Sequence, residues 1–288
     1  MLENVVIVIN KPKGITSHDV TAIVKKELKL KKVGHTGTLD PIATGVLVLL
    51  TNKCTKLSSV LTSTYKEYIA KVKLGVETDT LDITGNILKR EEVNVKKEEL
   101  EKVLNSFKGS YIQEVPIYSA VKINGKKLYE YARDNKKINL PKRKVEIKNI
   151  ELLDFTKENF TFKVTVSKGT YIRSLIRDIC SKLGTIGTME ELTRTKQGDF
   201  SLKKSNIIED IKNKKYKTIT LEEIFKEYPE ININEYEYNI VRNGNVLNKV
   251  ISKEYCKIIY KNKLIAIYTK NKNNIKPFIN LGGFDEIL

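Results

Sequence analysis

The segment Gly34–Leu50, "GHTGTLDPIATGVLVLL", joins a glycine-rich loop to an apolar run, with one carboxylate, Asp40, between them. The run "GVLVLL" at 45–50 is typical of a short buried strand. Asp40 precedes Pro41, which favours an extended backbone at the aspartate. Such a carboxylate is either part of a turn or a reactive group at the edge of a core. Taken alone, the segment favours the turn.

The composition indicates a folded protein with a polyanionic partner. Hydrophobic residues make up 40% of the 288 residues, and the formal net charge is +17. This apolar content suffices for a core, and a strong basic excess is typical of nucleic-acid-binding proteins. A membrane surface is a competing partner, but no basic amphipathic helix with a wide apolar face stands out. Cations and tyrosines are densest together at 122–148, which suits either an RNA backbone or a solvated surface hairpin.

Several other classes of function lack the sequence patterns they need. The three cysteines, at 54, 180 and 256, have no metal-ligand spacing, so we interpret them as reduced thiols of a cytoplasmic protein. The two histidines show no zinc-site spacing, and neither a P-loop nor a GxGxxG motif is present. No signal peptide or apolar run of membrane-spanning length is seen. We therefore expect no metal, no cofactor and no membrane association.

The periodicity predicts an α+β fold with a mainly antiparallel sheet flanked by helices. Strands are expected at 5–9, 45–50, 68–75, 145–153 and 160–168. Helices are expected after Ser17 as N-cap, over 96–109, and after Thr170 with an apolar stripe that ends at Gly184. A hairpin is expected at Asn124-Gly125. Strands outnumber helices and no βαβ repeat appears, which excludes a regular parallel architecture.

The character of the sequence changes after Pro229. Residues 201–230 are rich in Lys and Glu and are predicted to be helical, bridging two domains. Beyond them we expect short strands, one of them within 238–247, and a hairpin over 255–268 that turns at 261–263. The sequence therefore predicts a large domain at 1–230, with a basic insertion at about 122–148, and a small all-β domain at 231–288.

Two further segments carry groups suited to chemistry. In "SKGTYIRSLIRDI" (167–179), Arg173 lies off the apolar stripe of the expected helix, near its N-terminus. Its guanidinium could hold a carboxylate or phosphate bidentately, or form a surface salt bridge. In "STYKEYIAKV" (63–72), Tyr65 and Tyr68 must face opposite sides of the strand, so one of them could stack on a base or pack in the core. His35 could orient a substrate or satisfy a loop carbonyl.

Five long segments resemble, in order, the TruB family of bacterial tRNA pseudouridine-55 synthases, and the resemblance covers almost the whole chain. The segments are "NKPKGITSHDV" (10–20), "GHTGTLDPIATGVLVL" (34–49), "YKEYIAKVKLGVETDTLDITG" (65–85), "VPIYSAVKINGKKLYEYAR" (115–133) and "GTYIRSLIRDI" (169–179). The C-terminal part matches less well, although "VRNG" (241–244) and the later hairpin are similar to the small PUA-type domain of the family. The resemblance implies a pseudouridine-synthase catalytic domain at 1–230 and a PUA-like domain at 231–288.

The resemblance also implies roles for individual residues. Asp40 matches the catalytic aspartate, Tyr68 the tyrosine beneath the target uracil, and Arg173 the arginine paired with the aspartate. Three further positions match nucleotide contacts: His35, Tyr171 and Leu192. The implied reaction breaks the bond from C1′ to N1 of a uridine and joins C1′ to C5, without redox chemistry, metal or phosphate donor. Whether the aspartate attacks C1′ or removes a C2′ proton stays open, as does the base that removes the C5 proton.

The implied partner is tRNA, bound through its T-arm with the target uridine of the T-loop turned out of its stack. A monomer without an obligate protein partner is the family-level expectation. One alternative is a synthase of the related archaeal and eukaryotic RNA-guided type, which relies on partner proteins. Another is a non-catalytic RNA-binding or RNA-folding module. The joint presence of Asp40, Tyr68 and Arg173 argues against the second alternative.

Overall fold

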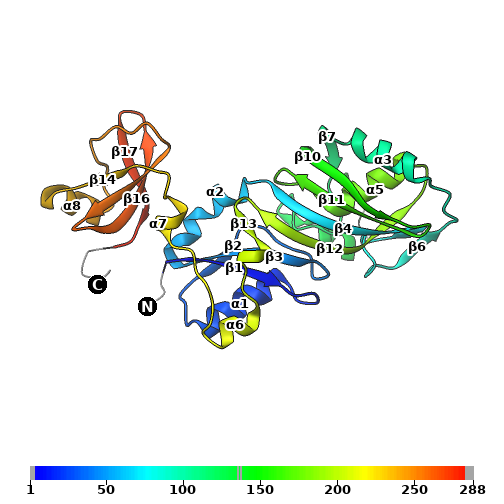
Figure 1. Cartoon of the computed structure of the whole chain (residues 1–288), viewed down its shortest axis with the longest axis horizontal. Helices are drawn as coiled ribbons and strands as arrows, with labels where there is room; N and C mark the ends of the chain where they lie inside the picture. Colours follow the sequence, from blue (N-terminus) through cyan, green and yellow to red (C-terminus); the bar gives the residue numbers. More distant parts are fainter. Residues whose placement is uncertain (1–3, 135, 137, 283–288) are drawn as a thin grey trace.

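The computed structural model describes residues 4–134, 136 and 138–282, and its main feature is a long mixed sheet (Figure 1). Within these residues the sheet has nine strands, ordered β1-β3-β12-β4-β11-β10-β7, with β2 paired to β3 and β13 to β12. The strands are β1 (Val6–Lys11), β2 (Val33–His35), β3 (Thr44–Thr51), β4 (Lys66–Leu74), β7 (Gly109–Glu114), β10 (Lys142–Phe155), β11 (Asn159–Val166), β12 (Gly187–Gln197) and β13 (Phe200–Ser201). Pairing is antiparallel except between β12 and β3. The predicted α+β fold with a mainly antiparallel sheet is confirmed.

Strand β3 is apolar along its length because both of its faces are buried. Leu47 and Leu49 belong to the larger core cluster, which also includes buried side chains of α1 (Ser17–Glu27) and α5 (Ile172–Lys182). Val46, Val48 and Leu50 belong to a second cluster that reaches the C-terminal part of the chain. Since successive side chains of a strand point to opposite faces, this one strand supplies two cores. The run "GVLVLL" is therefore a buried strand, as predicted.

Two helix starts differ from the sequence prediction. Thr16, and not Ser17, is the N-cap of α1: its side chain accepts from the Asp19 amide, while Asp19 accepts from the Thr16 amide. At α5 the cap is Tyr171, because the Thr170 hydroxyl donates instead to the carbonyl of Ser167. The predicted apolar stripe of α5 is confirmed by five buried side chains: Ile172, Leu175, Ile176, Ile179 and Cys180. In both cases the hydroxyl predicted to cap the helix has another partner.

The remaining helices before residue 230 are mostly short. They are α2 (Ser58–Thr62), α3 (Lys97–Ser106), α4 (Leu128–Arg133), α6 (Ile208–Lys212) and α7 (Leu221–Ile224), with the 3₁₀ turns η1 (Asn52–Leu57) and η2 (Leu202–Lys204). The prediction of a helical segment over 201–230 is thus only partly correct. This segment bridges to β1 twice, at Ile9↔Asn206 and Val6↔Ile219, which interrupts any continuous helix. None of the helices in the described part of the chain is both long and apolar enough to cross a membrane.

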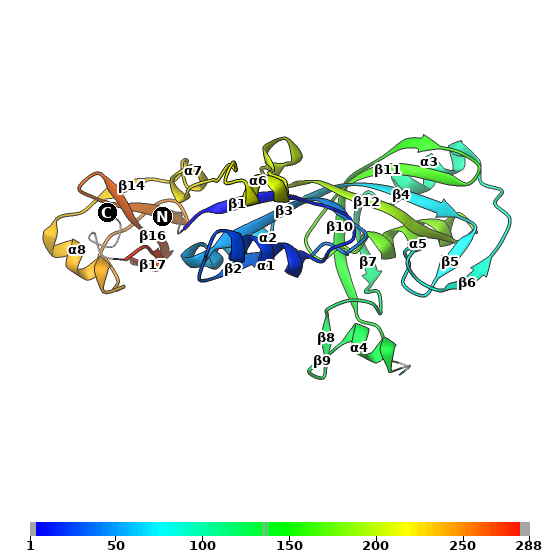
Figure 2. The same cartoon turned by 90° about the horizontal axis from the view of Figure 1, so that it is seen from below.

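The basic insertion projects away from the main sheet (Figure 2). It begins with a hairpin of β8 (Lys122–Ile123) and β9 (Lys126–Lys127), which is followed by α4. Outside the insertion, a second small hairpin joins β5 (Val76–Thr78) to β6 (Ile87–Arg90). The turn at Asn124 and Gly125 has positive φ at both residues, as predicted for this dipeptide. Positions 135 and 137 of the predicted insertion lie outside the described residues. The insertion rises from β7 and β10, the last two strands of the sheet.

The C-terminal part forms its own four-stranded sheet, ordered β14-β15-β16-β17. Its strands are β14 (Glu230–Asn232), β15 (Tyr255–Tyr260), β16 (Lys263–Asn271) and β17 (Asn274–Asn280). The predicted hairpin over 255–268 is confirmed, with positive φ at Lys261 and Asn262. Four rings join this sheet to the segment that precedes it, at centroid distances of 5.1–5.6 Å: Phe225, Tyr228, Tyr255 and Phe278. Positions 283–288 of the expected domain lie outside the described residues.

The strand expected within 238–247 is wrong, because this stretch contributes to helix α8 (Glu235–Arg242). Asn234 caps the helix by accepting from the Glu237 amide, and Glu237 in turn accepts from the Asn234 amide. Tyr238 and Val241, three residues apart, are buried in the cluster beneath the C-terminal sheet. A capping box and helical spacing therefore outweigh the local strand propensity.

Gly45 is a sensitive point, since it lies where β3 pairs with β12 and has φ of +105°. A Cβ atom there would lie 2.2 Å from the carbonyl oxygen of Arg194. We expect Gly45→Ala to lower the free energy of unfolding by about 3 kcal/mol or more, combining left-handed strain with overpacking. Gly109→Ala is the control, because Gly109 has φ of +99° but no heavy atom within 4 Å of the added Cβ. It should cost about 1–2 kcal/mol. Urea unfolding compares the two, and equal losses would contradict this account.

Candidate active site

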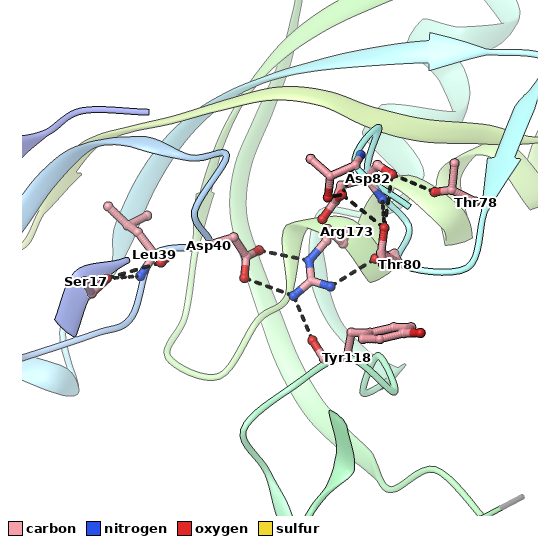
Figure 3. A network of polar contacts seen from close by, with 9 residues as sticks. Ser17, Leu39, Asp40, Thr78, Thr80, Asp82, Tyr118 and Arg173 are labelled. Carbon is pink, nitrogen blue, oxygen red and sulfur yellow. Dashed lines mark hydrogen bonds and ion pairs between the residues drawn. The ribbon is translucent and has the colours of Figure 1, made fainter. Parts of the chain in front are cut away.

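The loop that carries Asp40 is fastened on both sides of the aspartate by residues 11–17. On one side, the Ser17 hydroxyl accepts from the Leu39 amide at 2.9 Å and donates to the Leu39 carbonyl at 3.2 Å (Figure 3). On the other side, the Pro41 carbonyl accepts from the Gly14 amide at 2.8 Å. The backbone of Asp40 is thus fixed by its two neighbours, and its side chain is left to project.

A buried lysine completes this anchoring. The Nζ of Lys11, at the end of β1, donates to the carbonyls of Pro12, Ile15 and Pro41 at 2.8, 2.7 and 3.3 Å. Burial lowers the pKa of Lys11 to about 8, although the negative charge of Asp40 acts in the opposite direction. The role of Lys11 was not predicted from the sequence, although the residue lies in the segment 10–20 that resembles the family.

Arg173 meets Asp40 in a two-point contact. Its Nε and Nη2 donate to the two carboxylate oxygens of Asp40 at 2.9 and 3.1 Å (Figure 3). The side chain of Arg173 is 6% exposed and that of Asp40 is 33% exposed. A charged hydrogen bond that is shielded from water is stronger than an exposed one, so this contact fixes the orientation of the carboxylate. The side chain of Asp40 is nevertheless still partly exposed.

Two backbone carbonyls accept further hydrogen bonds from the guanidinium of Arg173. Nη1 of Arg173 donates to the Thr80 carbonyl and Nη2 to the Tyr118 carbonyl, both at 3.0 Å. The Thr80 turn is itself held by the buried Asp82, whose carboxylate accepts from the Thr80 hydroxyl and the Thr84 amide (Figure 3). The contacts of Thr80 and Tyr118 with Arg173 were not predicted from the sequence, because a backbone carbonyl acceptor has no residue-type signature.

Tyr68 and Leu192 lie on the central strands β4 and β12. In the register of these strands, Tyr68 is opposite Arg194 and Leu192 is opposite Ala70, so the two residues are diagonal neighbours. Both side chains are buried in the core cluster that also contains Leu39, the residue before Asp40. The structure thus brings Tyr68 and Leu192 to the same side of the sheet as the aspartate loop.

The other tyrosine of this strand segment, Tyr65, is 39% exposed. Its hydroxyl donates to Glu146 at 2.8 Å. The expectation that Tyr65 and Tyr68 face opposite sides is therefore met.

His35 and Tyr171 lie on two other elements, β2 and the start of α5. His35 ends β2, opposite Leu49, and its buried Nδ1 has no hydrogen-bond partner among the described residues. Burial, reinforced by the positive charge of Arg194, lowers the pKa of His35, so the imidazole is neutral near pH 7. Tyr171 precedes α5, and the guanidinium carbon of Arg143 lies 5.5 Å from its ring centroid. Neither side chain contacts Asp40 directly among the hydrogen bonds of the described residues.

The thiols and acidic groups of the described chain do not form a metal centre. No group of three His, Cys, Asp or Glu side chains within residues 4–134, 136 and 138–282 could hold a metal ion. The three cysteines are free and buried. Burial raises the pKa of Cys54 and Cys180 to about 12 and that of Cys256 to about 11. These thiols are accordingly unreactive core groups.

The depressed pKa of Lys11 predicts a pH dependence of stability. Lysine keeps its proton up to about pH 10.5 in the unfolded chain but releases it near pH 8 in the folded protein. Between these values the unfolded state binds more protons, so Lys11 contributes a rise of about 2 kcal/mol in the free energy of unfolding from pH 8 to 10. In Lys11→Met this gain should be absent.

The measurement is urea unfolding of the parent and Lys11→Met at pH 8 and pH 10. Lys25→Met, on the exposed face of α1, is the control and should follow the parent. A Lys11→Met protein with the same pH slope as the parent would show that Lys11 is not the titrating group.

Comparisons with known proteins agree on one family. A model described as the N-terminal domain of TruB family pseudouridylate synthases matches residues 25–172. A protein of Clostridium tetani named tRNA pseudouridine synthase B is 43% identical over 282 residues, which cover 95% of this chain and 98% of that protein. A protein of the same name from Caldicellulosiruptor saccharolyticus is 45% identical over 251 residues, with 87% and 86% coverage.

Solved structures show the same fold. A chain from a Cbf5–Nop10–Gar1 complex aligns with a TM-score of 0.69 and 26% identity, covering 96% of this chain and 85% of that one. A chain of an H/ACA RNP bound to a substrate RNA containing 2′-deoxyuridine aligns with a TM-score of 0.69 and 24% identity, over 98% of this chain and 86% of that one. By its family match and its relatives, the chain belongs to the TruB family of pseudouridylate synthases.

Proposed function

We propose that this chain is a tRNA pseudouridine synthase, an isomerase that converts uridine 55 of the T-loop to pseudouridine. Relatives named tRNA pseudouridine synthase B, which align over nearly their whole length, support this assignment. The observation that carries it is the fixed, half-shielded carboxylate of Asp40, held by the buried fork of Arg173. A positioned, ionised carboxylate is what a reaction at an electron-poor C1′ requires.

In this reaction the C1′–N1 bond breaks, the uracil turns without leaving the site, and C1′ joins C5 before the C5 proton departs. The carboxylate of Asp40 acts on the ribose, either by attack on C1′ or by removal of a C2′ proton. Both routes need the same thing from the protein, a carboxylate that is aimed before the substrate arrives. The contacts of Leu39, Pro41 and Arg173 hold the carboxylate in that orientation, so it needs no reorientation during the reaction.

The nucleotide would be held between several side chains. We assign Tyr68 to the face of the uracil, where its ring could stack on the base and its hydroxyl is a candidate for removing the C5 proton; it shares a core cluster with Leu39, the residue before Asp40. Three residues would contact the extruded nucleotide: His35, Tyr171 and Leu192. The neutral, partly exposed His35 can offer or accept a hydrogen bond, whereas a charged imidazole could only donate. Extrusion of a uridine costs a few kcal/mol of stacking, which these contacts must replace.

The rest of the tRNA would be bound by the positive surface. We assign residues 1–230 to the catalytic domain and 231–288 to a PUA-like RNA-binding domain, with the insertion at about 122–148 on the T-arm. In the insertion, Lys126 and Lys127 lie 5.2 and 5.3 Å from the ring centroids of Tyr131 and Tyr129, so cations and stacking surfaces alternate. We further propose a cytoplasmic monomer that needs no cofactor and no protein partner.

Asp40→Asn tests the central assignment. The amide keeps the size of the side chain but removes the charge, so we expect tRNA binding within about threefold of the parent and no detectable product. Pseudouridine formation is measured with the purified chain alone on an unmodified tRNA transcript. Asp199→Asn, an exposed aspartate in the turn before β13, is the matched control and should form product at the parental rate. Product formation by Asp40→Asn would refute the assignment.

The same assay addresses the RNA-guided alternative, which the structural likeness to the Cbf5 complex raises. A parent chain that is inert by itself and becomes active when a guide complex is added would favour that alternative. A parent that binds tRNA tightly but never forms pseudouridine would instead indicate a non-catalytic RNA-binding module.

Arg173→Lys tests the contribution of the fork. A lysine keeps the positive charge but cannot bind both oxygens of Asp40 while also reaching the Thr80 and Tyr118 carbonyls. We expect the single-turnover rate constant to fall about 100-fold with little change in tRNA affinity. The control is Arg177→Lys, one turn further along α5, where the arginine is partly exposed and pairs with Glu114 and Asp178. It should remain within about threefold of the parent.

A further inference from the structure

The start of α5, which carries Arg173, has no cap of its own. Tyr171 occupies the N-cap position without a capping side chain, and the nearby Thr170 hydroxyl is engaged with Ser167. The first backbone groups of a helix lack intrahelical partners, so an uncapped start is free to fray. Arg173 is only two residues beyond this point, and its fork has to meet Asp40 within tenths of an ångström. Another element must therefore fix the first turn.

Gln113 of β7 is that element. Its side chain is fully buried, and its Oε1 accepts from the Tyr171 amide at 2.8 Å while its Nε2 donates to the Tyr171 carbonyl at 3.1 Å. One carboxamide thus holds both polar groups of one backbone residue. The Nε2 also donates to the hydroxyl of Tyr111 at 2.5 Å, which fixes the orientation of the amide. Only glutamine or asparagine offers a donor and an acceptor side by side in this way, and asparagine is one methylene shorter.

Further contacts join the same strand pair and the chain beyond it to α5. Gln113 is opposite Arg143 in the β7–β10 ladder, and the guanidinium of Arg143 lies over the ring of Tyr171. Glu114, the next residue on β7, accepts from Arg177 at 3.1 Å. Beyond β7 the chain reaches Tyr118, whose carbonyl accepts directly from Arg173. The base of the insertion therefore contacts α5 at its N-cap, at Arg173 and one turn later at Arg177.

We propose that Gln113 is a positioning residue of this active site, which fixes the backbone of Tyr171 and thereby the fork of Arg173 on Asp40. The expected effect on catalysis rests on the proposed function, whereas the positioning of Arg173 by Gln113 does not depend on it. Gln113 touches neither the substrate nor Asp40 and acts through the helix start. Gln113 also lies at the foot of the insertion. It therefore connects the insertion, which would bind the RNA, to Arg173, which orients the carboxylate of Asp40.

The test compares Gln113→Met with Glu114→Gln. Methionine has nearly the same length and volume as glutamine but makes neither hydrogen bond, whereas Glu114→Gln weakens the same strand–helix contact away from Tyr171. For Gln113→Met we expect a 10- to 100-fold lower single-turnover rate constant and a tRNA Kd within about threefold of the parent. Glu114→Gln should keep both constants near the parental values.

A second readout follows the arginine without any reaction. The Nε–H of Arg173 donates to Asp40 in a buried position, so it should exchange slowly with water in ¹H–¹⁵N spectra of the parent. Gln113→Met should accelerate this exchange at least tenfold. Tyr111→Phe, which removes only the hydroxyl that orients the carboxamide, should have a smaller effect in the same direction. This milder variant decides the proposal if Gln113→Met cannot be isolated in folded form.

Parental exchange and a parental rate constant in Gln113→Met, or in Tyr111→Phe where that variant must decide, would overturn the proposal. A loss of tRNA affinity with an unchanged rate constant would overturn it as well. The two levels of inference are separable: if the parent forms no pseudouridine, the proposed function fails, while the exchange of the Arg173 Nε–H still decides whether Gln113 positions that side chain.

Discussion

The buried guanidinium of Arg173 is the point at which distant parts of this chain meet. It binds Asp40 from the loop before β3, the Thr80 carbonyl from the turn after β5 and the Tyr118 carbonyl from the foot of the insertion. Burial of a cation costs free energy unless each of its donors has an acceptor. The guanidinium therefore stabilises the arrangement of these segments, and their acceptors in turn stabilise the buried guanidinium. The aspartate gains a fixed direction from the same contacts. Removal of any acceptor would leave a buried donor unsatisfied as well as weaken the site.

The second constraint is the two-sided burial of β3. This strand anchors the C-terminal end of the aspartate loop, and its two faces belong to different core clusters. On the N-terminal side the loop is tied to residues 11–17, which themselves follow the neighbouring strand β1. A loop between a doubly buried strand and a hydrogen-bonded segment can move little. This rigidity allows Asp40 to remain partly exposed and still point in one direction.

Much of this architecture could be predicted from the sequence, because it depends on local patterns. Alternation predicted β4 and β11, while the turn residues at 124–125 and 261–263 predicted the two hairpins. Helix α8 differs from the predicted strand because its two buried residues lie in a short, polar stretch, where the capping pair Asn234 and Glu237 is the stronger signal. Both mistaken caps arose because a hydroxyl near a helix start can equally bond elsewhere.

The residue types of the site could be predicted from the sequence, but the contacts between them could be predicted only in part. Asp40, Tyr68 and Arg173 stand in recognisable motifs, but the roles of Lys11 and Gln113 depend on carbonyl groups that are brought close by folding. Backbone acceptors carry no sequence signature. A buried lysine or glutamine in an otherwise ordinary strand becomes informative only when its partners are visible.

The separation of these partners along the chain has a consequence for synthesis. Arg173 contacts residues that precede it by 133, 93 and 55 positions, and all of them leave the ribosome before the arginine does. The basic insertion and its supporting strand β7 are likewise complete before α5 exists. A growing chain therefore contains the basic insertion, which we propose binds RNA, before it contains the arginine that orients Asp40. The carboxylate can be oriented only after α5 has been made, which is later than the basic insertion.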